Sequence, residues 1–293
     1  FQLLWKKPKP LVPRHLRLDV TERLDANGAV VTPLAEDEVS LACEFFREHE
    51  VESIAICFLF SYLNDLHERR AAELVSELLP GVPLSVSSEI LPQWREYERT
   101  STTVADAHVK PVMARYLERL GSGMAESSYQ HELLIMKSNG GVTRASGAVE
   151  IPIETYLSGP AAGVVAGQAV AAAAGWENVI ITDMGGTSFD VSLVTKGEVA
   201  RRTEGEVAEG IPVALSMLDV RAIGAGGGSI AWIDEGGGLR VGPQSAGADP
   251  GPACYGLSGE EPTVTDANLV LGRLASGAFL GGRLGLDHKR AEE

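Results

Sequence analysis

Residues 181–194, with the sequence ITDMGGTSFDVSLV, constrain the fold more than any other stretch of this chain. Two apolar runs flank a Gly-Gly-Thr-Ser turn, and Asp183 and Asp190 frame that turn. The apolar runs predict strands over residues 179–182 and 189–196, and the glycines predict a tight reversal between them. A plain hairpin needs only one or two residues that tolerate positive φ, so the framing acids require a further explanation.

The residue types of the turn are typical of a phosphate site. Gly185 and Gly186 lack a Cβ, so their backbone N–H groups can approach an anion closely, and Thr187 and Ser188 add hydroxyl donors. Carboxylates repel phosphate, but they organise Mg²⁺ or its waters between protein and phosphate, which makes Asp183 the first metal candidate and Asp190 the second. The alternative is a glycine hairpin with two exposed acids.

The order of the other expected elements predicts an α/β protein. A strand over residues 16–24 precedes an Asn27-Gly28 hairpin turn, and helices and buried strands then alternate over residues 36–50, 53–60, 64–79 and 83–87. A long helix over residues 96–120 contains Pro111, which should kink or split it. A helix of small residues is expected over 158–175, and another begins at Thr265 or Asp266.

Further candidate residues lie in glycine-rich segments. Gly226, Gly227, Gly228 and Ser229 belong to a glycine turn that could contact nucleotide or substrate, or could simply connect two strands. Asp249 and Cys254 lie in a Gly/Pro-rich loop, and Cys254 is a candidate nucleophile or soft ligand although no histidine is near it in sequence. Asp266 is either a helix cap or part of a substrate site.

Two other motifs leave alternatives open. REYERTSTT, residues 95–103, is either a solvated helix start or a functional segment. SNGG, residues 138–141, is either a plain hairpin turn or a second nest of donors.

Composition excludes several classes of protein. The formal net charge of −15 and the pI of about 4.9 argue against a duplex nucleic-acid binder, which normally presents a basic face. No apolar run is long enough to span a bilayer, no signal peptide opens the chain, and the three cysteines match no zinc spacing. We therefore expect a cytoplasmic protein without nucleic-acid or membrane partners. The absence of an initiator Met suggests a piece of a longer chain.

These segments together resemble the hydantoinase A / 5-oxoprolinase / acetone carboxylase family. The resemblance is carried in family order by PLVPRHLRLDVTERLDANG, REYERTSTT, IMKSNGG, LSGPAAGV, DMGGTSFDVSLV, GAGGGSIAW, VGPQSAGADPGPACYG and PTVTDANLVLGRL. It implies an α/β fold of the actin-like ATPase type, with two related lobes and nucleotide in the cleft. Residues 1–100 would be the remainder of the family's N-terminal domain, and residues 101–293 its core domain. DMGGTSFDV would be the second phosphate motif, with the first expected before Phe1.

The resemblance also implies a function. The family couples ATP and Mg²⁺ to difficult carbonyl chemistry, which makes ATP-dependent hydrolysis of a cyclic amide, by phosphorylation of the amide oxygen, the first expectation. The catalytic residues would be Asp183 and Asp190. A ketone carboxylase subunit is the alternative, and an actin-like activator or binding module is a third. A hydantoinase B-type subunit or domain is the expected partner, in a hetero-oligomer.

Overall fold

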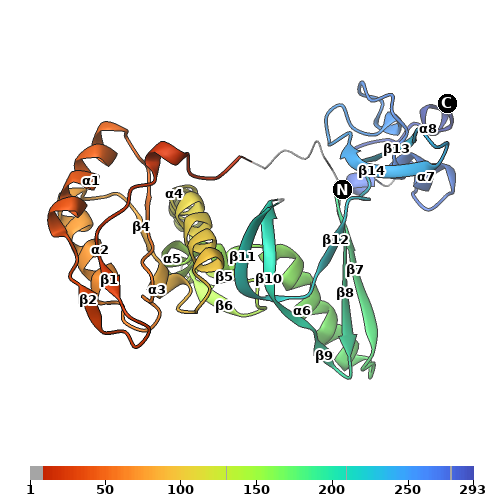
Figure 1. The fold of residues 1–293 in the computed structure, drawn as a ribbon. Helices are drawn as coiled ribbons and strands as arrows, with labels where there is room; N and C mark the ends of the chain where they lie inside the picture. The colour runs from red at the N-terminus through yellow and green to blue at the C-terminus, as the bar shows by residue number, and fades with distance from the viewer. Residues whose placement is uncertain (1–8, 130, 209, 278) are drawn as a thin grey trace. The chain divides into compact units, whose positions relative to one another are not determined.

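A computed structural model describes residues 9–129, 131–208, 210–277 and 279–293 of the chain (Figure 1). The architecture is mixed α/β, and the chain divides into two compact units. The first unit comprises Phe1–Ala162 and Arg201–Leu218, and the second comprises Gly163–Ala200 and Asp219–Glu293. These units differ from the domains at residues 1–100 and 101–293 that the family resemblance implies, and those domains stay a prediction.

The first unit begins with a short hairpin and a parallel strand pair. β1 (Arg23–Leu24) and β2 (Val30–Thr32) are antiparallel around the Asn27-Gly28 turn, which confirms the predicted hairpin. Of the strand predicted over residues 16–24, only Arg23–Leu24 forms, so the rest of that prediction is wrong. β2 has three residues and pairs with these two residues alone. Period-two alternation alone therefore did not make a strand. β3 (Ile54–Ile56) and β4 (Leu84–Val86) pair in parallel.

Two helices cover this parallel pair. α1 (Glu36–Glu48) and α2 (Leu66–Leu78) match the predicted helices, and each has one apolar face. Those faces meet β3 in one hydrophobic core, formed by Val39, Cys43, Ile54, Ile56, Ala71, Val75 and Leu79. Cys43 is part of this core and is 1% exposed.

The longest helix runs through its proline. α4 (Glu96–Glu126) continues past Pro111, so of the predicted kink or split at this residue the split is wrong, and the kink stays a prediction. Proline has no N–H, which leaves the carbonyl of Ala107 without its helical donor. The hydroxyl of Ser53 donates to that carbonyl at 2.7 Å and replaces the missing bond. This compensation comes from a residue 54 positions away.

α4 packs on a hairpin from much later in the chain. β10 (Arg201–Ala208) and β11 (Ile211–Leu218) are antiparallel, and β11 lies against α4 in a core that includes Ala105, Val213 and Met217. The remaining elements of this unit are short: α3 (Ser87–Ile90), β5 (Leu134–Met136), β6 (Val142–Arg144), α5 (Ala145–Glu150) and the 3-10 turns Arg14–Leu16 and Pro152–Thr155.

The second unit contains the sheet that carries the Asp183 motif. β7 (Val179–Met184), β8 (Phe189–Thr195) and β12 (Arg221–Ile223) form its antiparallel path, and β9 (Glu198–Val199) also pairs with β8. α6 (Ser158–Ala173) lies along this sheet, where a Cβ on Gly167 would be 2.8 Å from Cδ1 of Ile181. The absence of a side chain at Gly167 therefore permits this close packing of the helix on the sheet.

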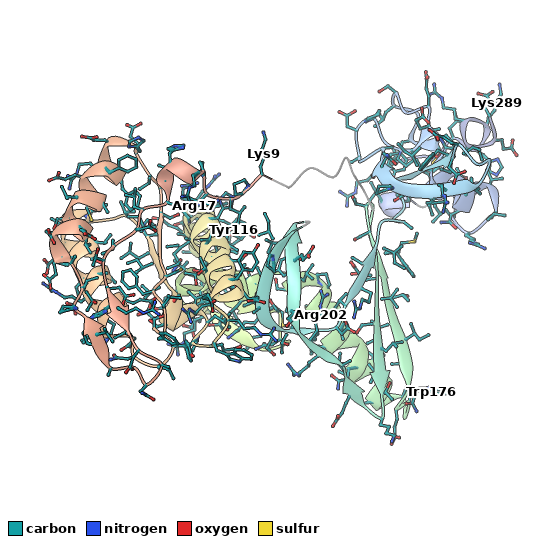
Figure 2. All side chains as sticks on the ribbon, viewed as in Figure 1. Lys9, Arg17, Tyr116, Trp176, Arg202 and Lys289 are labelled. Carbon is teal, nitrogen blue, oxygen red and sulfur yellow. The ribbon has the colours of Figure 1, made fainter. Side chains whose placement is uncertain are left out.

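The end of the chain completes the second unit. β13 (Ser229–Ile233) pairs with β14 (Leu239–Ser245), and α7 (Val264–Val270) and α8 (His288–Glu292) follow, with 3-10 turns at Ala253–Tyr255 and Phe279–Gly282. Figure 2 places Trp176 at the end of the β7–β8 hairpin away from these elements. In the described part of the chain, no helix is both long enough and apolar enough to cross a membrane.

Candidate functional site

The turn between β7 and β8 brings two carboxylates together. Asp183 and Asp190 are direct partners in the antiparallel register, one residue before the turn-proximal pair Met184 and Phe189. Directly opposite side chains in such a ladder have Cβ atoms about 5 Å apart, and like charges there are destabilising. Asp183 is exposed and Asp190 half-buried. A cation at this position would offset the repulsion between the two carboxylates.

The glycine loop at residues 224–229 lies against the back of this turn. Three consecutive N–H groups of the loop donate to three consecutive carbonyl oxygens of the turn. The pairs are Gly226 to Thr187 at 3.3 Å, Gly227 to Gly185 at 2.9 Å and Gly228 to Gly186 at 2.6 Å. The two glycine-rich segments that the sequence suggested separately therefore form one backbone-to-backbone contact.

The turn keeps donors that the protein itself does not use. Among the described residues, the N–H groups of Gly186, Thr187 and Ser188 have no hydrogen-bond acceptor, and Gly186 and Thr187 are exposed. The hydroxyl of Ser188 donates to Oδ2 of Asp190 at 3.3 Å. Three adjacent N–H groups without an acceptor in the described part of the chain therefore lie between Asp183 and Asp190, and phosphate binding by this turn stays a prediction.

Two further segments converge on the glycine loop. Thr265, near the start of α7, donates from both its N–H and its hydroxyl to the carbonyl of Gly227, each at 2.8 Å. Ala246, in the Gly/Pro-rich loop after β14, donates from its N–H to the carbonyl of Gly228 at 2.8 Å. The structure thus joins four of the sequence motifs in one hydrogen-bonded assembly within the second unit.

The three substrate-site candidates occupy different environments. Asp249 is exposed in its loop, whereas Cys254 and Asp266 are buried and in contact. Oδ1 of Asp266 accepts from the Cys254 N–H at 2.8 Å, and Oδ2 accepts from the N–H and hydroxyl of Thr263. Thr263 and Asp266 form a capping box, so the helix begins at Val264 and the capping role of Asp266 is confirmed. A substrate contact of these residues stays a prediction.

The environment of Cys254 opposes thiolate chemistry. Burial, followed by the neighbouring Asp266, raises the pKa of the Cys254 thiol to about 12. A nucleophilic cysteine needs the opposite shift, toward neutral pH. Conversely, the hydrogen bonds from Thr263 and Cys254 outweigh burial at Asp266 and lower the pKa of its carboxyl.

The two motifs with open alternatives belong to the first unit. The first residues of REYERTSTT, such as Arg95, are exposed, as expected of a solvated helix start. Arg99, Thr102 and Thr103 are instead buried. The guanidinium of Arg99 donates to the carbonyls of Gln93 and Phe58. The SNGG segment forms the hairpin turn between β5 and β6, in which Oδ1 of Asn139 accepts from the Gly141 N–H at 2.8 Å.

Sequence reasoning missed two residues at this site. Thr265 was considered only as a helix start, and its contact with a loop 38 residues earlier gives no local signal. The second is Gly163 of α6, which lies beside Asp183: a Cβ on Gly163 would be 4.0 Å from Oδ2 of Asp183. No group of three or more His, Cys, Asp or Glu residues suited to a metal ion occurs within residues 9–129, 131–208, 210–277 and 279–293.

Comparison with known proteins identifies the family. Residues 99–293 match the family described as Hydantoinase/oxoprolinase, and residues 1–79 match its N-terminal region. Caprolactamase subunit alpha of Pseudomonas jessenii is 45% identical over 281 residues, which cover 96% of this chain and 40% of that protein. The chain spans less than half the length of the curated relatives it matches.

Solved structures agree with this assignment. The ATP-dependent caprolactamase of Pseudomonas jessenii superposes with a TM-score of 0.78 at 42% identity, covering 99% of this chain and 42% of that chain. A nucleotide-free acetone carboxylase, from work on ATP-dependent acetone carboxylation, superposes with a TM-score of 0.80 at 32% identity, covering 98% and 41%. The chain therefore belongs to the hydantoinase/oxoprolinase family.

Proposed function

We propose that residues 185–188 bind the phosphate groups of ATP, and that the protein uses ATP to hydrolyse a cyclic amide. The observation that carries the proposal is the row of unpaired N–H groups at Gly186, Thr187 and Ser188, beside the facing carboxylates of Asp183 and Asp190. Backbone N–H groups arranged in this way bind phosphate, and the absence of a Cβ at Gly186 allows a close approach.

The proposed fold is the actin-like ATPase fold, with this turn as one of its two phosphate motifs. The antiparallel β7–β8 pair with a phosphate turn at its tip supports this proposal. A Walker loop differs, since it joins a strand to a helix and contains a lysine.

The residues present fit a magnesium ion. Mg²⁺ commonly binds through one or two carboxylates together with phosphate oxygens and water, so a larger protein cluster is not required. Asp183 and Asp190 would hold the ion or its waters, and their mutual repulsion in the ladder favours a cation between them. When bound, Mg²⁺ would supply charge neutralisation for the phosphates.

The proposed chemistry activates an amide carbonyl, which is a poor electrophile. Transfer of the terminal phosphoryl group of ATP to the amide oxygen releases ADP and turns that oxygen into a good leaving group. Water then adds to the carbonyl carbon, and the ring C–N bond breaks as the nitrogen leaves as an amine, which gives an acyl phosphate. A second water hydrolyses the acyl phosphate to the carboxylate and free phosphate. The protein's part is to fix the phosphate donors and to orient the reactants.

A ketone carboxylase subunit is the second candidate, because a solved acetone carboxylase shares this fold at a TM-score of 0.80. Cyclic amide hydrolysis is favoured because the chain is 45% identical to the caprolactamase subunit but 32% identical to the solved acetone carboxylase. That caprolactamase chain is named as a subunit, which supports a hetero-oligomer with a hydantoinase B-type partner. The proposed location is the cytoplasm, where ATP is available.

The test is ATP-dependent phosphate release by the full-length protein with its B-type partner. Caprolactam, hydantoin and 5-oxoproline are compared with acetone plus bicarbonate. Phosphate release that a cyclic amide stimulates, and that Asp183→Ala lowers by at least 100-fold, is the expected result. Glu198→Ala is the matched control, because Glu198 is an exposed acid on the same sheet, away from the turn.

Stimulation by ketone and bicarbonate alone would assign the protein to the carboxylases. Release that no substrate stimulates, or that Asp183→Ala leaves unchanged, would refute the proposed role of the turn.

A further inference from the structure

The turn at residues 185–188 exposes donors on one side because its carbonyls are held on the other. In a trans peptide, the C=O of one residue and the N–H of the next point in opposite directions. The peptide units that join residues 185 to 188 are trans, since the cis bonds of the described chain lie at Gly242-Pro243 and Asp249-Pro250. Each carbonyl orientation therefore fixes the direction of the N–H group that follows it.

This rule links the glycine loop to the free donors one by one. The carbonyls of Gly185, Gly186 and Thr187 face the loop, where they accept from Gly227, Gly228 and Gly226. The N–H groups in the same peptide units are those of Gly186, Thr187 and Ser188, and these are the ones without acceptors. Hydrogen bonding at the carbonyl also polarises each peptide unit and strengthens its N–H as a donor.

The glycine loop fits this role sterically. A Cβ on Gly226 would lie 2.5 Å from the carbonyl carbon of Thr187 and 2.6 Å from the backbone N of Ser188. A Cβ on Gly228 would lie 3.0 Å from the carbonyl oxygen of Gly186. Both contacts are with backbone, so no flexible side chain can move aside. The loop approaches the turn only because these residues are glycines.

Thr265 holds the loop from its other side. Its N–H and its hydroxyl both donate to the carbonyl of Gly227, whose own N–H donates to Gly185. Thr265 is 8% exposed, and its helix is anchored by the Thr263–Asp266 capping box and by buried Leu269. A rigid helix start thus determines the position of the loop that backs the turn.

We propose that Thr265 and residues 226–228 are positioning residues that align the three N–H donors of the phosphate turn, without contacting nucleotide through those amides. The proposal rests on the proposed function, because it assumes that residues 185–188 bind phosphate. It assigns the glycine loop a role in preorganising the site, so that little reorientation is required when phosphate binds.

The test measures MgATP affinity of the full-length protein by calorimetry, together with its melting temperature. Thr265→Val removes the hydroxyl donor but keeps shape and N–H, and Thr265→Ser keeps the donor. We expect roughly 3- to 10-fold weaker MgATP binding for Thr265→Val, a change of less than about 2-fold for Thr265→Ser, and more than about 10-fold weaker binding for Gly226→Ala.

Steady-state kinetics supply a readout that a merely structural role would not give. The KM for ATP should rise in Thr265→Val while the KM for the organic substrate stays the same. Gly285→Ala is the matched control, since a Cβ there meets no atom within 4 Å and its φ is not left-handed.

The outcomes separate this inference from the proposed function. If the wild type binds MgATP and Asp183→Ala weakens that binding, but Thr265→Val and Gly226→Ala do not, the positioning role is overturned and the phosphate turn remains. Equal losses in Thr265→Val and Thr265→Ser, with a matching fall in melting temperature, also overturn it. If the wild type does not bind MgATP, the proposed function fails first.

Discussion

The carboxylate of Asp266 offers the most quantitative test of the assembly, because every hydrogen bond that it makes is buried. Asp266 is 3% exposed, and it accepts from the Cys254 N–H on one oxygen and from the N–H and hydroxyl of Thr263 on the other. Asn has one acceptor oxygen, so Asp266→Asn leaves the donors on one side without a partner. Asp266→Ala leaves both sides without one.

The magnitude follows from the number of orphaned donors. A buried donor without a partner costs about 2 kcal/mol. Asp266→Asn with its amide oxygen toward Thr263 orphans the Cys254 N–H and should lower the local unfolding free energy by about 2 kcal/mol, whereas Asp266→Ala orphans all three donors and should lower it by about 6 kcal/mol. Because 1.4 kcal/mol is a factor of ten, the smaller loss corresponds to roughly 30-fold faster hydrogen exchange. The amides to follow are those of Cys254 and Thr263.

The effect should depend on pH in one direction. The hydrogen bonds lower the pKa of Asp266 in the folded protein, so its contribution is fully present above the unfolded pKa, near 3.9. The contribution is lost as the pH falls through the folded pKa, and the difference between wild type and Asp266→Asn should then disappear. Asp249→Asn is the control, because Asp249 is exposed and has no hydrogen-bond partner among the described residues.

Unchanged exchange at Cys254 and Thr263 in Asp266→Ala would refute this reasoning. So would a difference between wild type and Asp266→Asn that grows as the pH falls.

Three further predictions follow from burial and packing. Cys254 should resist alkylation at pH 8 until the protein is denatured, because it is fully buried and the pKa of its thiol is raised to about 12. Rapid modification of the native protein, measured by mass spectrometry, would contradict this. Ser53→Ala should lower the free energy of unfolding in urea by about 1–3 kcal/mol, because it leaves the buried carbonyl of Ala107 without a donor. A loss near zero would disprove the compensation for Pro111. Gly167→Ala should lower the melting temperature, because the added Cβ would clash with Ile181. Gly159→Ala is the control, since a Cβ there meets no atom within 4 Å, and equal effects of the two variants would argue against the tight packing of α6.

Local sequence patterns predicted several of the regular elements. Helical periodicity predicted α1 and α2, the Asn27-Gly28 pair predicted the first hairpin, and apolar runs around Gly185-Gly186 predicted β7 and β8. These predictions succeeded because each depends on residues close together in the chain. The strand over residues 16–24 was wrong because a strand also requires a partner. The helix is not split at Pro111, where the distant Ser53 supplies a hydrogen bond to the carbonyl that the proline leaves without its donor.

The sequence by itself determined the chemistry of the turn: two glycines, two hydroxyls and two acids in an order that suits phosphate and a divalent cation. Only the tertiary structure decided which turn donors remain free, since that depends on the carbonyls that the loop at residues 224–229 engages. It also decided that Cys254 and Asp266 are buried partners, and that Thr265 holds Gly227. Hydrogen bonds between segments distant in sequence leave no local pattern, because they depend on how the whole unit packs.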